Sequence, residues 1–270
     1  MNWGLVYNIN IKKTVSLANE IYEFLNKKGE VFVEESFAKD KKVKGYSHEE
    51  INEKADIVLT IGGDGTILRA LEKIEKPIFA INSGGMGFLT ETEPKYAIEG
   101  LNKIIAGKFN VEERAKLKIT VDGIRLPDAA NEVTVQTSHI AKMIHLEIYV
   151  ENELLERFGA DGVIVATSTG STSYALSAGG PILDPGVNAM VIAPLAPFKL
   201  STRPWVVLLN KKIGIKLLPK SKESKLVIDG ESSQLITLNS KIIITASEKK
   251  ARFVRFGESF YQRVRLKLVR

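Results

Sequence analysis

The sequence predicts a protein of the α/β + β class, with an N-terminal Rossmann-like α/β domain followed by a β-rich, sandwich-like domain. Residues 1–112 alternate short apolar, β-branched runs with amphipathic segments, which is typical of βα units around a parallel sheet. From residue 113 the pattern changes to short, alternating or β-rich segments separated by turn residues. We expect domains at 1–112 and 113–252, and a C-terminal tail at 253–270 that returns to the first domain.

The first domain is expected to contain parallel strands and covering helices. Residues 14–28 repeat apolar side chains at helical spacing. Ser47 followed by Glu50 predicts a capping box at the start of a short helix. Asp40–Tyr46 is polar and contains a glycine, so we expect a mobile loop there. The other expected elements are strands at Trp3–Tyr7, Glu30–Val33, Ile57–Ile61 and Pro77–Ile81, and a helix at Glu93–Ile105 that stops before Gly107.

The second domain is expected to consist mainly of strands. One exception is a helix near residues 171–179, for which Ser171 or Thr172 would be the N-cap. Asp229-Gly230-Glu231 is interpreted as a hairpin turn. Strands are expected at Leu117–Val121, Ala130–Gln136, Ile144–Val150, Glu153–Arg157, Val163–Ala166, Ala189–Ala193, Trp205–Leu209, Lys212–Leu218, Lys225–Asp229 and Lys241–Ala246.

Composition narrows the possible functions. The 270 residues include no cysteine and three histidines, and no histidine pair has H-E-x-x-H spacing, so we expect no protein-bound metal centre such as a zinc site. The formal charge is +6, but no DNA- or RNA-binding motif accompanies it, and we expect no nucleic-acid partner. No apolar run is long enough to span a membrane, and the N-terminus lacks a basic leader. We therefore expect no membrane association and a cytoplasmic location.

A glycine-rich turn follows the expected strand Ile57–Ile61. Gly62-Gly63-Asp64-Gly65 separates this strand from helix-compatible residues, which places Asp64 where open α/β sheets bind ligands. Glycines permit positive φ and let a ligand approach the backbone, and a helix start offers N–H groups to an anion. A capped βα turn without a ligand explains this motif equally well. The other motifs of the chain must distinguish a ligand-binding loop from a simple capped turn.

Three further motifs are candidates. Asn82–Leu89 is a second glycine-rich loop that follows an apolar strand, so both loops could face one crevice. Asn131-Glu132 begins a strand-like run and suits either a sheet edge or a ligand contact. Asp161–Pro181 leads from an Asp-Gly turn and a strand into a loop rich in hydroxyl groups. Such a loop is either a flexible connector or a site for sugars and phosphates.

Together these motifs resemble the NAD kinase family. The resemblance rests on G-G-D-G-T at Gly62–Thr66, N-x-G-x-x-G-F-L at Asn82–Leu89, Asn131-Glu132, Asp229-Gly230 and the Asp161–Pro181 segment, in the family's order over nearly the whole chain. G-G-D-G alone also occurs in 6-phosphofructokinases and in lipid kinases. Asp161-Gly162 followed by T-x-T-G-S-T-x-Y-x-x-S-x-G-G-P is specific to NAD kinases.

The resemblance implies a role for each matching residue. Asp64 would be the general base that deprotonates the 2′-hydroxyl of the adenosine ribose, and Gly63 and Gly65 would let the loop approach phosphates. Asn131 and Glu132 would bind the ribose and phosphate side of the dinucleotide, and Asp161 its nicotinamide end. Thr172, Ser173, Tyr174 and Ser177 would line the adenine and ribose pocket, with Thr169 nearby, and Ala175 and Leu176 of the same segment would also bind the cofactor. The other implied contacts are Phe88, Ala196 and Glu231 on the dinucleotide, and Arg69 and Lys142 on phosphates.

Two positions depart from the family's pattern. Ser168 stands where proline is common, which would loosen the loop without removing a ligand contact. Gly159 stands where some relatives carry a basic residue near the nicotinamide end, which bears on whether NADH is also accepted.

The implied activity is phosphorylation of NAD to NADP, with Mg²⁺ or another divalent metal on the donor's phosphates. The donor is ATP, another nucleotide or inorganic polyphosphate. The resemblance also implies a homodimer or homotetramer. The alternatives are another G-G-D-G kinase, acting on a lipid or a sugar, and a silent NAD(P)-binding sensor. The sensor is disfavoured because Asp64 is present, and a lipid kinase would not need an adenine-type pocket at 172–177.

Overall fold

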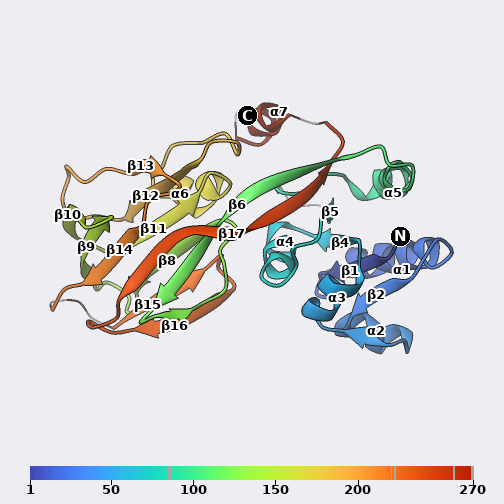
Figure 1. Cartoon of the computed structure of the whole chain (residues 1–270), viewed down its shortest axis with the longest axis horizontal. Helices are drawn as coiled ribbons and strands as arrows, with labels where there is room; N and C mark the ends of the chain where they lie inside the picture. The colour runs from blue at the N-terminus through green and yellow to red at the C-terminus, as the bar shows by residue number, and fades with distance from the viewer. Residues whose placement is uncertain (84–86, 220, 222, 258, 269–270) are drawn as a thin grey trace. The chain divides into compact units, whose positions relative to one another are not determined.

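The structure is a computed structural model and describes residues 1–83, 87–219, 221, 223–257 and 259–268. Contacts divide the chain into two compact units. The first comprises Met1–Glu113 and Ala251–Arg270, and the second comprises Arg114–Lys250. Strands β6 (Asn110–Val121) and β17 (Ile242–Arg255) each run from one unit into the other (Figure 1).

The first unit is built on a parallel sheet. Its strands lie in the order β17-β5-β4-β1-β2-β3, and each neighbouring pair is parallel. Leu5 lies opposite Leu59 on one side and Val33 on the other, which fixes the register at the centre of the sheet. The strands are β1 (Trp3–Tyr7), β2 (Val31–Glu34), β3 (Gly45–Tyr46), β4 (Ile57–Gly62) and β5 (Ile78–Asn82), together with the end of β17.

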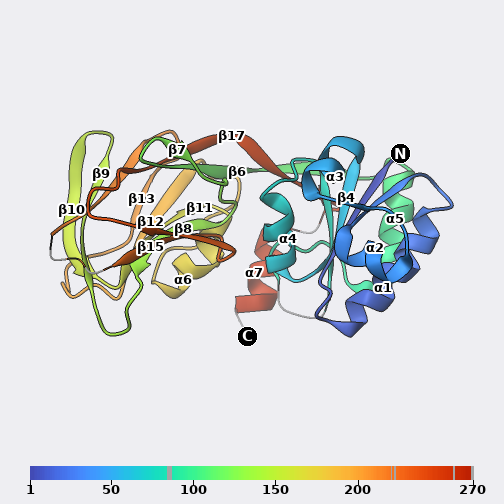
Figure 2. The same ribbon diagram turned by 90° about the horizontal axis from the view of Figure 1, so that it is seen from below.

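Helices bury the apolar faces of this sheet (Figure 2). Leu5 shares one hydrophobic cluster with Ile21 of α1 and Leu101 of α5. Gly4 faces the other side, because successive strand residues alternate, and a Cβ there would lie 2.6 Å from Ile51 of α3. The helices are α1 (Lys12–Leu25), α2 (Glu35–Lys41), α3 (His48–Lys54), α4 (Asp64–Leu71), α5 (Ala97–Ile105) after the 3₁₀ turn η1 (Pro94–Tyr96), and α7 (Phe260–Leu268).

The second unit contains antiparallel strands in two sheets. One sheet has the order β10-β9-β14-β17, with β6 paired to β17 and β7 paired to β6. The other has the order β13-β12-β11-β8-β15-β16. The bounds are β7 (Ile124–Arg125), β8 (Glu132–Thr137), β9 (Ile144–Val150), β10 (Glu153–Ala160), β11 (Gly162–Thr167), β12 (Ala189–Leu195), β13 (Trp205–Leu208), β14 (Ile213–Leu217), β15 (Ser224–Ile228) and β16 (Ser232–Ile236).

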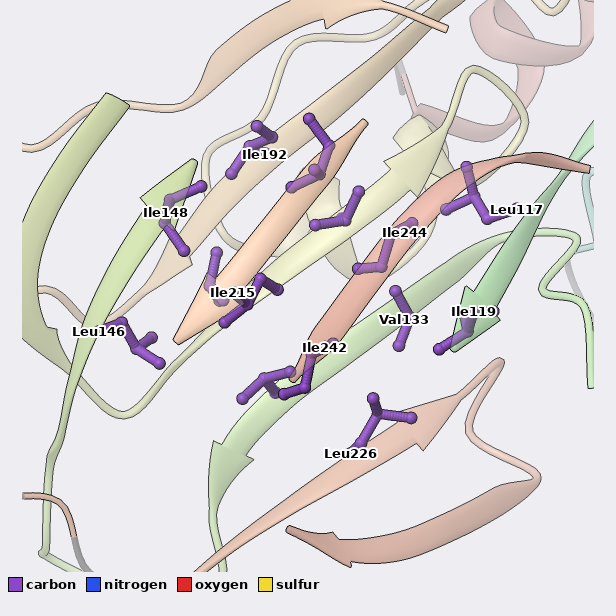
Figure 3. Close-up of a cluster of buried hydrophobic side chains, with 14 of the residues drawn as sticks. Leu117, Ile119, Val133, Leu146, Ile148, Ile192, Ile215, Leu226, Ile242 and Ile244 are labelled. Atoms are coloured by element: carbon purple, nitrogen blue, oxygen red, sulfur yellow. The ribbon is translucent and has the colours of Figure 1, made fainter. Parts of the chain in front are cut away.

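Side chains from both sheets form the core of the second unit (Figure 3). Ile148 and Ile244 come from the first sheet, and Val133, Ile192 and Leu226 come from the second. Two sheets that bury a shared apolar layer define a β-sandwich. A short helical segment follows β11 and consists of η2 (Gly170–Thr172) and α6 (Tyr174–Ser177).

The structure confirms the predicted class and most elements, including the Ser47–Glu50 capping box. Two local predictions are wrong, and one strand was missed. The expected loop at Asp40–Tyr46 instead contains the end of α2, a left-handed residue at Lys42, and β3. Neither Ser171 nor Thr172 caps α6, because that helix begins at Tyr174 without a side-chain cap. Strand β16 follows the Asp229-Gly230-Glu231 turn and was not predicted.

Among the described residues, no helix has both the length and the apolar character needed to cross a membrane.

Candidate active site

Asp64 lies at the carboxyl end of the parallel sheet, where β4 gives way to α4. Gly63 is the N-cap residue, and Asp64 is the first residue of the helix. The Asp64 carboxylate accepts hydrogen bonds from Phe88 N–H at 2.8 Å and from Leu89 N–H at 3.2 Å. The glycine loops that follow β4 and β5 therefore meet at this carboxylate. Gly84, Gly85 and Met86 of the second loop lie outside the described residues.

The glycines around Asp64 provide space rather than unusual backbone angles. Gly63 has a φ of −92°, and Gly65 lies inside α4, so the expected positive φ is not what this turn uses. Within the part of the chain that the structure describes, a Cβ at Gly63 would have no heavy atom within 4 Å apart from its chain neighbours, which leaves room for a ligand to approach the backbone. A Cβ at Gly87 would lie 2.4 Å from Asp64 Oδ1, so this position needs glycine to admit the carboxylate.

Arg69 lies one turn further along α4 and is engaged by the protein itself. Its Nη1 contacts Glu34 Oε2 at 2.9 Å, and its Nη2 donates to the Tyr7 carbonyl at 2.9 Å. Glu34 also accepts from Tyr7 N–H at 2.8 Å and contacts His48 at 3.4 Å. Burial acts to raise the pKa of Glu34, but the His48, Tyr7 and Arg69 contacts together lower it. Arg69 is therefore held at the carboxyl end of the sheet, with its side chain 42 % exposed.

Phe88 is partly buried, and its ring lies under the Lys267 ammonium at 5.2 Å. Its N–H is one of the two donors to the Asp64 carboxylate, so Phe88 belongs to the loop that contacts Asp64.

In the second unit, Asn131 and Glu132 are held by Asp229. The Asp229 carboxylate accepts hydrogen bonds from the N–H groups of Ala130, Asn131 and Glu132 at 2.7, 2.8 and 2.9 Å. Asp229 and Gly230 have φ values of +50° and +74°, which confirms the predicted turn between β15 and β16. In the sequence, Asp229 is notable only as part of the Asp229-Gly230-Glu231 turn and the Asp229-Gly230 motif. In the structure, its side chain positions the backbone of Ala130–Glu132.

Several buried polar atoms near this turn have no hydrogen-bond partner among the residues that the structure describes. They are Asn131 Oδ1, Glu132 Oε2 and Thr169 Oγ1. Glu132 Oε1 contacts Ser173 Oγ at 3.4 Å, and a Cβ at Gly170 would lie 2.2 Å from the Asn131 carbonyl. The hydroxyl-rich segment therefore packs directly against Asn131. Buried polar groups are normally satisfied, so these three atoms are candidate contacts for a polar ligand.

The carboxyl groups here have perturbed ionisation. Burial, followed by the nearby charge of Asp229, raises the pKa of Glu132 to about 7. Burial also raises the pKa of Asp229, although its three N–H donors act in the opposite direction.

The remaining candidates of the second unit fall into two groups. Thr172, Ser173, Tyr174, Ala175, Leu176 and Ser177 lie in η2 and α6 or between them, on the Asn131 side, and exposed Glu231 follows the Asp229 turn. The second group lies at the start of β11: Asp161 N–H donates to Leu195 O, next to Ala196, and Phe198 N–H donates to Gly159 O. Exposed Lys142 precedes Met143, whose sulfur is 2.9 Å from a Cβ at Gly159. The structure does not bring the two groups together, since Glu132 and Asp161 are separated by about 17 Å of strand.

The described residues contain no cluster of three or more His, Cys, Asp or Glu side chains that could hold a metal ion.

Comparison with known proteins identifies the class of protein that carries this fold and site. Residues 3–109 match the ATP-NAD kinase N-terminal domain, and residues 130–256 match the ATP-NAD kinase C-terminal domain. An NAD kinase from Methanothermobacter thermautotrophicus is 42 % identical, covering 100 % of this chain and 96 % of the relative. An NAD kinase from Thermococcus kodakarensis is 40 % identical, covering 99 % of both chains.

Two solved structures have similar folds. The NAD kinase from Archaeoglobus fulgidus in complex with ATP has a TM-score of 0.81 and 31 % identity, covering 98 % of this chain and 99 % of that one. Yeast NADH kinase complexed with NADH has a TM-score of 0.93, covering 100 % of this chain and 87 % of that one, and at 24 % identity it shows the fold alone. The chain is thus a phosphotransferase that acts on an alcohol group. It belongs to the NAD kinase family, as its motifs predict.

Proposed function

We propose that this chain transfers a phosphoryl group from ATP to the 2′-hydroxyl of the adenosine ribose of NAD, with Asp64 as the general base. The observation that carries this proposal is the Asp64 carboxylate at the carboxyl end of β4, fixed by two N–H groups beside the open space at Gly63. Membership of the NAD kinase family indicates the substrates NAD and ATP, and the Asp64 carboxylate can accept the proton of the ribose hydroxyl group.

The proposed reaction transfers one proton, forms one bond to phosphorus and breaks another. The proton of the ribose 2′-hydroxyl passes to the Asp64 carboxylate as the oxygen forms a bond to the γ-phosphorus. The bond from that phosphorus to the β,γ-bridging oxygen breaks, and ADP leaves with the electron pair. Gly63 and Gly65 let the backbone approach the donor's phosphates, and Arg69 and Lys142 are proposed phosphate partners. The first domain (1–112) thus supplies the base.

The second domain (113–252) is proposed to bind the dinucleotide. The partnerless oxygens of Asn131, Glu132 and Thr169 support a ligand with several hydroxyl groups at this place. The tail, 253–270, is proposed to pack on the first domain. The adenine and ribose contacts are assigned to Thr169, Thr172, Ser173, Tyr174, Ala175, Leu176 and Ser177, with Phe88, Ala196 and Glu231 as further contacts.

Asp161 and Gly159 are proposed to face the nicotinamide end. A dinucleotide seated at Glu132 must extend about 17 Å along β8 and β11 to reach Asp161. An extended dinucleotide with its two ends held apart suits this separation.

A divalent metal, most simply Mg²⁺, is part of the proposal. Mg²⁺ is commonly bound by one or two carboxylates together with substrate phosphates. Asp64 offers one carboxylate, and the described residues form no group of three or more His, Cys, Asp or Glu side chains that could enclose the ion. These residues fit an ion that arrives with the nucleotide and is held mainly by its phosphates. When bound, the ion neutralises charge on the phosphates.

A homodimer or homotetramer and a cytoplasmic location complete the proposal, and both rest on the expectations from the sequence. Sedimentation of the purified chain tests the assembly.

An assay of donors and acceptors tests the proposed reaction. Purified protein with Mg²⁺ is given NAD or NADH as acceptor, and ATP or inorganic polyphosphate as donor, and NADP(H) is measured. We expect NADP with NAD and ATP, and none when Mg²⁺ is chelated by EDTA. Absence of NADP(H) in every combination would reject the proposed function.

A further inference from the structure

A cluster of buried charges joins the C-terminal helix to the loop after β5. The Glu91 carboxylate, 2 % exposed, contacts Arg255 Nη1 at 2.9 Å and Arg263 Nη2 at 3.0 Å through the same oxygen. Its other oxygen accepts a hydrogen bond from Phe256 N–H at 2.7 Å. Arg255 also contacts Glu112 at 2.7 Å. All these residues belong to the first unit.

The same arginines reach the segment that holds Asp64. Arg263 Nη1 donates to the Phe88 carbonyl at 3.4 Å, and Arg255 Nη1 donates to the Leu89 carbonyl at 3.1 Å. The Phe88 carbonyl and the Leu89 N–H belong to one peptide group. That peptide therefore accepts from Arg263 on one side and donates to Asp64 Oδ1 on the other, at 3.2 Å. Hydrogen bonds linked in this way polarise one another.

Further contacts make this segment a rigid support. Glu91 N–H donates to the Ala80 carbonyl of β5 at 2.8 Å, which ties the cluster to the sheet. Lys267, one turn beyond Arg263 on α7, lies over the Phe88 ring at 5.2 Å. Helix α7 therefore covers the Phe88–Leu89 segment with two basic side chains.

Stability alone is a weak reason for such a cluster, because buried ion pairs are often replaceable by apolar side chains without loss of stability. Precise placement of the Asp64 carboxylate is a better reason for the cluster. A general base acts only when it lies within hydrogen-bond reach of the proton, and misplacement by about 1 Å can reduce the rate about 100-fold. The Phe88 and Leu89 N–H groups set the direction of the Asp64 carboxylate. Arg263 holds the peptide that carries the Leu89 N–H, and Arg255 holds the next peptide through the Leu89 carbonyl.

We propose that Arg263 is a positioning residue for phosphoryl transfer, which acts on Asp64 through the Phe88–Leu89 peptide. Arg255 and Glu91 hold the same support. This inference rests on the proposed role of Asp64 as base. The Arg263 side chain is 4 % exposed and contacts Glu91 and the Phe88 carbonyl, so its loss should slow the chemical step and leave the binding of NAD unchanged.

Helix α7 offers a matched control. Arg265 is an exposed arginine of the same helix, so Arg263→Met and Arg265→Met change charge and length identically. We expect Arg263→Met to lower kcat roughly 10- to 100-fold, the range typical of residues that orient a catalytic group, with KM for NAD within about twofold of the wild type. Arg265→Met should leave both constants unchanged. Arg263→Lys keeps the charge beside Glu91 but lacks the second donor arm, and should lower kcat less than Arg263→Met.

Thermal unfolding by circular dichroism accompanies each assay. If Arg263→Met folds and its kcat equals that of Arg265→Met, the positioning role is wrong. Should Arg263→Met fail to fold, Arg263→Lys decides alone: wild-type kcat in that variant rejects the proposal, and reduced kcat with wild-type KM supports it. If kcat fell by the same factor in Arg263→Met and Arg265→Met, the proposal would be rejected as well, because the loss would not depend on the contact of Arg263 with Phe88. Asp64→Asn separates the two proposals, because normal turnover in that variant would reject the base itself rather than its support.

Discussion

Asp229 and Glu132 are joined by hydrogen bonds in both directions, one through the Asp229 side chain and one between the main chains. Glu132 N–H donates to the Asp229 carboxylate at 2.9 Å, and Asp229 N–H donates to the Glu132 carbonyl at 2.9 Å. This reciprocal pair sets the turn after β15 beside the start of β8. The side chains of Asn131 and Glu132 therefore project from a backbone that Asp229 fixes.

Replacing Asp229 by asparagine should weaken NAD binding more than it slows chemistry. The amide offers one acceptor oxygen where the carboxylate serves three N–H donors, and a buried donor left without a partner costs about 1–3 kcal/mol. We expect KM for NAD to rise about 10-fold or more and Tm to fall. Asp122→Asn is the control, because Asp122 also begins an Asp-Gly turn with positive φ and accepts one N–H, from Lys241, away from the site. Equal KM values for the two variants would contradict the role of Asp229.

The elevated pKa of Glu132 predicts a pH-dependent stability. The folded protein keeps a proton on Glu132 up to about pH 7, whereas the unfolded chain releases it near the ordinary value of 4.5. The folded state thus binds more protons between these values, and its stability falls as pH rises through this window. Glu132→Gln removes this dependence and should gain up to about 3 kcal/mol relative to wild type between pH 4.5 and 7.5. Urea unfolding at both pH values measures it, and parallel curves for the two proteins would show that Glu132 titrates normally.

The two glycines beside Asp64 should respond differently to alanine. Gly87→Ala places a Cβ 2.4 Å from Asp64 Oδ1, so the carboxylate must move, and kcat should fall about 100-fold while NAD binding persists. The added Cβ of Gly63→Ala meets no atom within 4 Å among the described residues outside its chain neighbours, so its Tm should match the wild type. Its KM for ATP should nevertheless rise, because the added methyl group occupies the space that the phosphates would use. Unchanged ATP kinetics in Gly63→Ala would place the donor elsewhere.

Arg69 provides a test of whether a side chain committed to the protein also serves the donor. Arg69→Met removes the contacts to Glu34 and to the Tyr7 carbonyl, so the pKa of Glu34 should rise and Tm should fall at neutral pH. If Arg69 also binds phosphate, KM for ATP should rise several-fold, as expected when one charge-assisted hydrogen bond is lost. A lower Tm with unchanged KM for ATP would assign Arg69 to structure alone.

The sequence predicted most strands and the position of Asp64 because local signals suffice for both. Buried β-branched runs identify strands such as Ile57–Ile61, and the glycines after them identify the turn. The capping box at Ser47 and Glu50 is equally local. These features depend on neighbours in the chain.

Features that depend on distant contacts were not predictable. Asp229 binds the N–H groups of Ala130–Glu132, which lie about 100 residues away in the chain. The sequence of an Asp-Gly turn does not show whether the aspartate side chain makes such distant hydrogen bonds. Glu91, Arg255 and Arg263 belong to no recognisable sequence motif. Their pairing arises because the end of β17 and helix α7 both lie against the loop after β5. The predicted loop at Asp40–Tyr46 failed for a related reason, since β3 is fixed by pairing with β2 rather than by its own composition.

The most direct test of the central claim is the comparison of Asp64→Asn with the wild type in a single-turnover assay, with NAD affinity measured separately by calorimetry. Asparagine keeps the shape of the side chain but cannot accept the proton of the ribose hydroxyl. The predicted result is a rate of NADP formation lower by about 10²- to 10⁴-fold with an NAD Kd close to that of the wild type. A variant that forms NADP at the wild-type rate would contradict the assignment of Asp64 as the base.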